Sequence, residues 1–305
     1  MFSDNHLFKY NSLSSYDKEN LKNKKLFLRT ATKFNDVFDS TPYYSDEIFL
    51  KMLRDHINEN GIVVPNYINF NRLTYQEKLK VFKSYFRHNF DSTLKDAGLI
   101  SCFSKASDSN IMWVRYAKEY EGAVFVYDKT DLKNAAINHL LKLSKENLFH
   151  NVPDQILRRA VTLEDVSYSE YRPDITKELE NTYEDFSKNK EVFMSNDDFD
   201  RITNKMFFFK TYEWEYEKEV RLLIHNFLNG KAYPYNDQGK TLLIDIKPVA
   251  VILGFKVPRS AAKYIIEVCL NEGISLYGSG PHFLDKKCKI NVEILKKEYI
   301  EEMLK

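Results

Sequence analysis

The chain has 305 residues, 43% of them hydrophobic and 14% aromatic, which is enough apolar material for a sizeable core in one large domain. Its 45 lysine and arginine residues almost balance its 44 aspartate and glutamate residues, which excludes a general attraction to nucleic acid or anionic membranes. Cys102, Cys269 and Cys288 are widely spaced and form no CxxC pair, which indicates a reduced cytoplasmic protein. No run of about 18 apolar residues and no signal peptide is present, so we expect neither a membrane segment nor secretion.

Hydrophobic periodicity and turn residues predict alternating strands and helices. Strands are expected at 7–10, 24–29, 99–104, 123–127, 163–171, 214–224, 241–246, 249–253, 274–277 and 290–295. Helices are expected at 17–25, 42–59, 74–95, 108–120, 131–147, 175–193, 198–209 and 260–271, and in the tail from 296. Thr41 is the expected cap of the helix that starts at Pro42, and Gly61 its expected end. Since no repeat or linker is evident, we predict one α+β domain over 1–305 with a helical insertion at about 131–204.

The strand expected at 214–224 begins with charged and aromatic residues and ends in an apolar run. Strand alternation gives one face to Glu215, Glu217, Glu219 and Arg221. Three carboxylates on one face repel each other, so this face is expected to meet water, a cation or a ligand. Glu219 and Arg221 lie nearest the apolar end and are expected to be partly desolvated. They form either a chemically active pair or an Arg–Glu salt bridge at a strand edge.

Three aromatic residues of the helix expected at 108–120 share one face, because Trp113, Tyr116 and Tyr120 are spaced at i, i+3 and i+7. They are interpreted either as core packing or as an aromatic wall for a flat ring, with stacking worth about 1 kcal/mol. In the second case the Tyr116 hydroxyl is also available for chemistry.

A polar loop carries Asn35, Asp36 and Asp39 between the anchors Phe34 and Phe38. Side chains of this type either close an Asx turn ahead of the next helix or hold the hydroxyls of a ligand. Both interpretations stay open at the level of sequence.

Nucleophilic and metal-dependent chemistry has less support. Cys102 follows an apolar strand with no base nearby, which is typical of a buried structural thiol. The histidines are scattered without an HExxH motif, so no metal site is predicted. Glu219 and Arg221 have the Glu-x-Lys spacing of some metal-dependent nucleases, but arginine is a poor proton shuttle, so the nuclease hypothesis is second.

Several short motifs occur in a fixed order along the chain. They are Leu7-Phe8-Lys9-Tyr10 with Ser12, Lys33-Phe34-Asn35-Asp36 with Phe38-Asp39, Ser101-Cys102-Phe103-Ser104, Met112-Trp113 with Tyr116-Ala117 and Gly122, and Trp214 with Glu217, Glu219 and Arg221. In this combination, over about residues 7–255, the chain resembles a widespread bacterial family labelled only as a domain of unknown function. It departs from that family at Val37, where proline is usual.

That family in turn looks like a distant relative of the ADP-ribosyltransferases. The resemblance implies two small mixed sheets that split around NAD, with Lys9 where the first strand usually has histidine or arginine. It implies an NAD-dependent mono-ADP-ribosyltransferase that acts on protein or nucleic acid, as a cytoplasmic bacterial toxin or anti-phage effector with a possible antitoxin partner. The implied site residues are Glu219, with Glu217 in reserve, and Tyr116 for catalysis, and Lys9, Tyr10, Ser12, Asn35, Trp113 and Arg221 for NAD binding. The alternatives are a metal-dependent nuclease effector and a non-catalytic partner-binding module.

Overall fold

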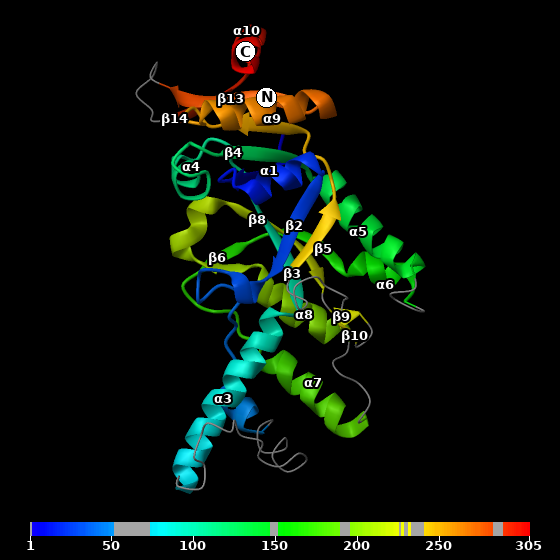
Figure 1. The fold of residues 1–305 in the computed structure, drawn as a ribbon. Helices are drawn as coiled ribbons and strands as arrows, with labels where there is room; N and C mark the ends of the chain where they lie inside the picture. The colour runs from blue at the N-terminus through cyan, green and yellow to red at the C-terminus, as the bar shows by residue number, and fades with distance from the viewer. Residues whose placement is uncertain are drawn as a thin grey trace. The chain divides into compact units, whose positions relative to one another are not determined.

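The computed structural model describes residues 2–51, 74–146, 152–189, 196–225, 227–228, 231–232, 241–282 and 289–305 (Figure 1). They divide into two compact units, unit 1 (residues 1–29, 99–168 and 212–305) and unit 2 (residues 30–98 and 169–211). The fold is mixed α/β with one large mixed sheet and many helices. No helix in these ranges is both long enough and apolar enough to cross a bilayer.

The strands of the large sheet follow most of the predicted positions. They are β1 (His6–Asn11), β2 (Lys25–Thr30), β3 (Gly98–Ser104), β4 (Ala123–Asp128), β5 (Val161–Asp165), β8 (Glu219–His225), β11 (Thr241–Asp245), β12 (Ala250–Leu253), β13 (Ser275–His282) and β14 (Lys289–Ile294). The shorter strands are β6 (Ser167–Ser169), β7 (Phe209–Thr211), β9 (Phe227–Leu228) and β10 (Lys231–Ala232).

The helices are α1 (Ser15–Lys22), α3 (Tyr75–Lys95), α4 (Asn110–Tyr116), α5 (Lys129–Lys145), α6 (Asp154–Arg159), α7 (Thr176–Asn189), α8 (Asn196–Phe207), α9 (Arg259–Glu272) and α10 (Lys297–Leu304). The described residues also contain the 3-10 helices η1 (Ala31–Lys33) and η3 (Tyr212–Glu217). Capping explains several boundaries. The hydroxyls of Ser14 and Thr74 each form a capping box at the start of α1 and α3, and Gly273 ends α9 in the left-handed conformation.

The large sheet forks at β3. Its main path runs β11-β2-β3-β1-β4-β12-β13-β14, and β8 pairs with both β3 and β5 off this path. β1 pairs with β4 along its whole length but meets β3 only where Phe8 faces Ser104. The resemblance implied two small mixed sheets that split around NAD, whereas most described strands of unit 1 join in one sheet with two branches that diverge from β3, and β9 and β10 form a separate pair.

Both faces of the sheet are covered at β4. Its alternate residues Phe125 and Tyr127 enter the main core, under α5 and α9, while Val124 and Val126 join a second cluster around Trp113. All seven residues of β8 are buried, so this strand has no solvent face. The strand predicted to have one wet face is therefore an interior strand.

Unit 2 holds η1, α3, α7, α8 and β7. The helix expected at 42–59 begins later than predicted, because Tyr43 forms a parallel bridge with Asp174 and residues 46–51 are the first in helical geometry. The Ser45 hydroxyl, rather than Thr41, accepts the amide of Ile48 at its start, at 3.3 Å. Gly61, its expected end, lies outside the described residues, as does Cys288.

Other predicted boundaries are also corrected. The helix expected at 108–120 ends at Tyr116, because Lys118, Glu119 and Tyr120 take positive φ angles of 47°, 54° and 72°. The strand expected at 214–224 begins only at Glu219, since η3 occupies the residues before it. The predicted helical insertion also contains the strands β5 and β6.

Two glycines allow backbone segments of unit 1 to approach each other closely. A Cβ atom on Gly122 would lie 2.1 Å from the Asn11 carbonyl oxygen, and one on Gly254 would lie 2.1 Å from the Tyr120 carbonyl oxygen. We predict that Gly122→Ala lowers the free energy of unfolding by about 2–3 kcal/mol, because backbone atoms must move apart. Gly280→Ala, where a Cβ meets nothing within 4 Å, is the matched control and should stay within about 0.5 kcal/mol of wild type in urea unfolding. Equal losses in the two variants would contradict the close-approach argument.

His225 ends β8 in the core, and burial lowers its pKa from 6.5 to about 4. The folded protein therefore keeps the ring neutral at a pH where the unfolded chain binds a proton. This contribution to stability is complete above pH 6.5 and is lost as the pH falls toward 4. We predict that wild type loses about 2 kcal/mol more than His225→Gln between pH 7 and pH 5 in urea unfolding. Parallel pH profiles would contradict this.

Candidate functional site

Polar side chains gather at the fork of the sheet in unit 1. Lys9 reaches from β1 to β3, where its Nζ donates to Ser101 Oγ at 2.9 Å and to the Cys102 carbonyl oxygen at 3.3 Å. Burial lowers the pKa of Lys9 and Arg29 adds to the lowering, while the charges of Asp17 and Glu219 act in the opposite direction. Since β1 and β3 diverge here, the Lys9 ammonium group provides a hydrogen-bond donor for the Cys102 carbonyl oxygen of β3.

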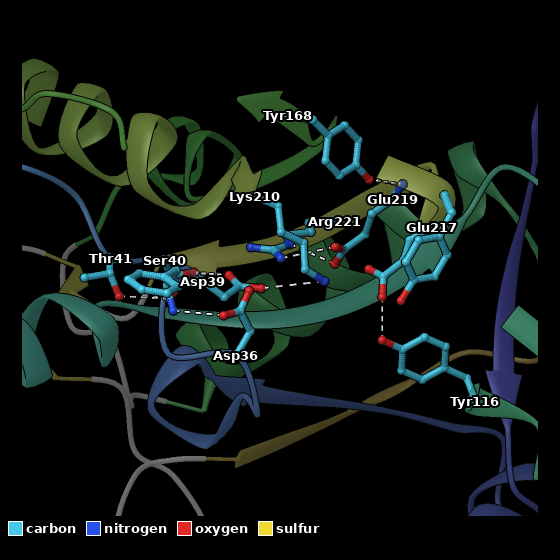
Figure 2. A network of polar contacts seen from close by, with 12 residues as sticks. Asp36, Asp39, Ser40, Thr41, Tyr116, Tyr168, Lys210, Glu217, Glu219 and Arg221 are labelled. Carbon is cyan, nitrogen blue, oxygen red and sulfur yellow. Dashed lines mark hydrogen bonds and ion pairs between the residues drawn. The ribbon is translucent and has the colours of Figure 1, made fainter. Parts of the chain in front are cut away.

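The next strand, β8, adds a buried ion pair to the same cluster (Figure 2). Arg221 Nε donates to Glu219 Oε1 at 2.8 Å, and Nη2 donates to Oε2 at 3.2 Å. Glu219 is 3% exposed and Arg221 is fully buried. The predicted desolvation and the salt bridge are both present, and the pair lies inside the sheet rather than at an edge. Burial, followed by the charge of Glu219, raises the pKa of the Cys102 thiol, so this thiol is protonated and unreactive.

Glu217 has a different partner. The Tyr116 hydroxyl donates a short hydrogen bond to Glu217 Oε1, and Glu217 is 4% exposed (Figure 2). Burial raises the pKa of Tyr116, and the hydrogen bond to Glu217 raises it further, so Tyr116 keeps its proton and acts as a neutral donor. Glu219 is therefore paired with a guanidinium, whereas Glu217 accepts a hydrogen bond from a tyrosine hydroxyl.

Strained backbone flanks the Tyr116–Glu217 hydrogen bond on both sides. Lys118, Glu119 and Tyr120 follow Tyr116 in the left-handed conformation, and Lys218 follows Glu217 with φ of 46°. Each such residue costs about 1–2 kcal/mol relative to right-handed geometry. Residues in this conformation cluster at functional sites, where the surrounding structure maintains the strain.

An exposed arginine lies beside this pair. The Arg115 guanidinium is 5.0 Å from the centre of the Trp214 ring and 5.8 Å from that of Tyr216, and it donates to the Tyr216 hydroxyl. The rings of Trp214 and Tyr216 are only partly buried, with centroids 6.2 Å apart. These residues of α4 and η3 form a surface of flat groups, which suits contacts with an aromatic ring or an anion.

Trp113 and Tyr10 pack in the second cluster of the core. Trp113 is fully buried, stacks on Tyr120 at 5.8 Å, and donates from Nε1 to the Ser107 carbonyl oxygen at 2.9 Å. The Tyr10 ring meets Trp113 edge-on at 5.5 Å, and its hydroxyl donates to the Ala106 carbonyl oxygen at 2.8 Å. The predicted aromatic trio is therefore divided. Trp113 and Tyr120 stack on each other, and Tyr116 bonds to Glu217.

Ser12 and Asn35, the two remaining residues expected to bind NAD, are exposed. Ser12 Oγ donates to Asp17 Oδ2 at 3.2 Å, next to the capping box of α1. Asn35 belongs to unit 2. The structure therefore brings together Lys9, Glu219 and Arg221 as one group, and Tyr116 and Glu217 as another.

The polar loop of unit 2 is a turn with a buried acid. Asp36 Oδ1 accepts the Phe38 amide at 2.9 Å, which is the predicted Asx turn. Asp39, 2% exposed, lies 3.8 Å from Lys210 Nζ and accepts a hydrogen bond from the Ser40 hydroxyl at 2.8 Å (Figure 2). Lys210 was not found by sequence reasoning, because it follows a run of phenylalanines that gives no polar signal.

Two further residues of unit 1 make contacts that were not predicted from the sequence. The Ser104 hydroxyl donates to the Glu217 carbonyl oxygen at 2.7 Å, and the Tyr168 hydroxyl accepts the Glu219 amide at 2.8 Å. Ser104 belongs to a recognised motif but had no assigned role, and nothing around Tyr168 in the sequence marks it. Among the described residues, no group of three or more histidine, cysteine, aspartate and glutamate side chains is arranged to hold a metal ion.

Comparison with protein families gives one match, to the model described as a protein of unknown function (DUF2971), over residues 112–222. The matched segment is less than half of the chain and contains Trp113, Tyr116, Glu217, Glu219 and Arg221. This is consistent with the predicted resemblance to a family of unknown function. Neither the curated proteins nor the solved structures give a match.

The buried ion pair generates a stability prediction. We expect Arg221→Met to lower the free energy of unfolding by about 3–5 kcal/mol, because it leaves the Glu219 charge buried without its guanidinium. The double variant Glu219→Leu with Arg221→Met should recover a large part of this loss, since apolar residues replace buried pairs well. Asp165→Asn, which breaks an exposed pair with Lys105, is the control and should cost about 1 kcal/mol or less in urea unfolding. A double variant as unstable as the sum of the single variants would contradict this account.

Proposed function

We propose that the chain is an NAD-dependent mono-ADP-ribosyltransferase in which Glu217 is the carboxylate beside the reacting ribose. The observation that carries this proposal is the hydrogen bond between Tyr116 and the buried Glu217, flanked by left-handed backbone on both sides. Glu219, the first candidate from the sequence, accepts hydrogen bonds from Arg221 at both carboxylate oxygens. We therefore assign Glu219 to structural support and Glu217 to catalysis.

The chemistry requires a negative charge near the ribose. When the bond between nicotinamide and ribose breaks, nicotinamide leaves with the bonding electron pair and the sugar acquires oxocarbenium character. The acceptor then attacks the same carbon and loses its proton. A neutral hydroxyl orients a carboxylate without neutralising its charge, whereas a guanidinium neutralises the carboxylate with which it pairs.

The surface beside Tyr116 carries groups suited to a dinucleotide, which supports the proposal. Arg115 is exposed and stacks on the partly buried rings of Trp214 and Tyr216. A guanidinium is suited to pyrophosphate, and flat rings are suited to stacking on nicotinamide or adenine. Trp113 and Tyr10 are engaged in the core, and Lys9 and Arg221 are engaged at the fork, so we assign those four residues to support of the site.

The proposal is tested by incubating the protein with NAD labelled on the adenylate part, with protein, RNA and DNA acceptors in separate reactions. We expect Glu217→Gln to lower label transfer about 100-fold or more, because the charge that stabilises the transition state is removed. Tyr116→Phe should lower it less, about 10-fold, since the charge remains but loses its orientation.

Glu215→Gln is the matched control, because Glu215 belongs to the same 3-10 helix and is exposed. Its transfer rate should stay within about two-fold of wild type, in proteins of equal melting temperature. Release of free ADP-ribose without acceptor would indicate NAD hydrolysis at the same site. If wild type leaves NAD intact with every acceptor, or if Glu217→Gln matches wild type, the proposal is wrong. Magnesium-dependent degradation of RNA or plasmid without NAD would instead support a nuclease.

The wider role, as a toxin or an anti-phage effector with an antitoxin partner, stays a prediction from the resemblance. It requires the activity above, and the acceptor that takes the label decides which cellular target to examine.

A further inference from the structure

A single residue separates the two glutamates and takes an unusual backbone conformation. Lys218 has φ of 46°, and its side chain is exposed. In an unbroken strand, Glu217 and Glu219 would project from the same face, two residues apart. With Lys218 left-handed, the carboxylate of Glu217 meets Tyr116 while that of Glu219 meets Arg221.

We propose that Ser104 and Tyr168 are positioning residues that hold Lys218 in the left-handed conformation and thereby fix Glu217 against Tyr116. We call the contacts of Ser104 and Tyr168 with the backbone around Lys218 the clamp. Its effect on catalysis rests on the proposed function. Its effect on the backbone conformation does not depend on that function and is tested separately.

The end of β3 holds one side of the turn. The Ser104 hydroxyl donates to the Glu217 carbonyl oxygen at 2.7 Å and accepts the Ala106 amide at 3.1 Å. The amide of Lys105, which directly follows Ser104, donates to the Lys218 carbonyl oxygen at 3.0 Å. Ser104 is fully buried, so its hydroxyl has no water to replace the Glu217 carbonyl.

The segment after β5 holds the other side. The Tyr168 hydroxyl accepts the Glu219 amide at 2.8 Å, and the Val166 amide donates to the Glu219 carbonyl oxygen at 2.9 Å (Figure 2). The Lys218 amide donates back to the Glu215 carbonyl oxygen at 3.1 Å. The peptide groups on both sides of Lys218 are therefore bound, and two of these bonds depend on side-chain hydroxyls that can be removed by substitution.

The first experiment measures the backbone without reference to activity. Hydrogen exchange of the peptide covering residues 214–221 is followed by mass spectrometry in wild type, Ser104→Ala and Tyr168→Phe. We expect exchange of this peptide to be at least about 10-fold faster in both variants, because each loses one bond of the clamp. Ser275→Ala and Tyr171→Phe, at exposed positions, are the matched controls and should exchange as wild type does. Unchanged exchange in both clamp variants would overturn the proposal.

A second set of variants distinguishes the conformation of Lys218 from its charge. Glycine and asparagine adopt the left-handed region readily, whereas a β-branched residue does not. Lys218→Gly and Lys218→Asn should therefore keep the slow exchange of wild type, and Lys218→Val should lose it. If all three behave alike, the left-handed conformation at this position has no role.

Transfer kinetics then connect the clamp to the reaction. We expect Ser104→Ala and Tyr168→Phe to lower kcat about 10-fold with KM for NAD within about two-fold, because a misplaced carboxylate affects the transition state more than ground-state binding. Lys218→Gly should keep wild-type kcat. Wild-type kinetics together with fast exchange would overturn the positioning role. Absence of any NAD reaction in wild type would remove the proposed function and leave the exchange result to decide the clamp alone.

Discussion

The buried pair of Glu219 and Arg221 is the constraint on which the arrangement of unit 1 depends. A fully buried guanidinium loses several kcal/mol of hydration, and the bidentate carboxylate of Glu219 offsets part of that loss. The pair therefore fixes the register of β8 between β3 and β5, because a shift by one residue would turn the guanidinium to the opposite face. The fixed start of β8 in turn determines where η3 must end, and so where Glu217 lies.

The fork at β3 explains why the polar cluster occurs there. A continuous sheet satisfies its own peptide groups, but β1 and β8 both pair with β3, and β1 does so at a single register position. The carbonyl of Cys102 accepts the Lys9 ammonium, and Ser104 and Lys105 donate to the carbonyls of Glu217 and Lys218. Side chains and the turn after β3 thus replace ladder hydrogen bonds where the two branches diverge.

The sequence predicted those parts of the structure that depend on local pattern. Apolar periodicity located β1, β3, β4, β12 and α3, and the apolar end of β8 correctly indicated that Glu219 and Arg221 are desolvated. It missed the beginning of β8, because Lys218 is left-handed although lysine gives no signal for that conformation. It also could not predict Tyr168, since its bond to the Glu219 amide joins residues 51 positions apart and depends on the fork.

The proposed division of roles between the two glutamates rests on the same geometry. A carboxylate that stabilises a developing cation has to be charged and oriented, whereas a carboxylate that anchors a strand is neutralised by a buried cation. A regular strand would give Glu217 and Glu219 the same environment, because residues two apart share a face. The left-handed Lys218 separates them, so that one carboxylate stabilises the strand while the other meets a tyrosine hydroxyl beside the exposed Arg115. Backbone strain at one residue thereby gives two neighbouring carboxylates different chemistry.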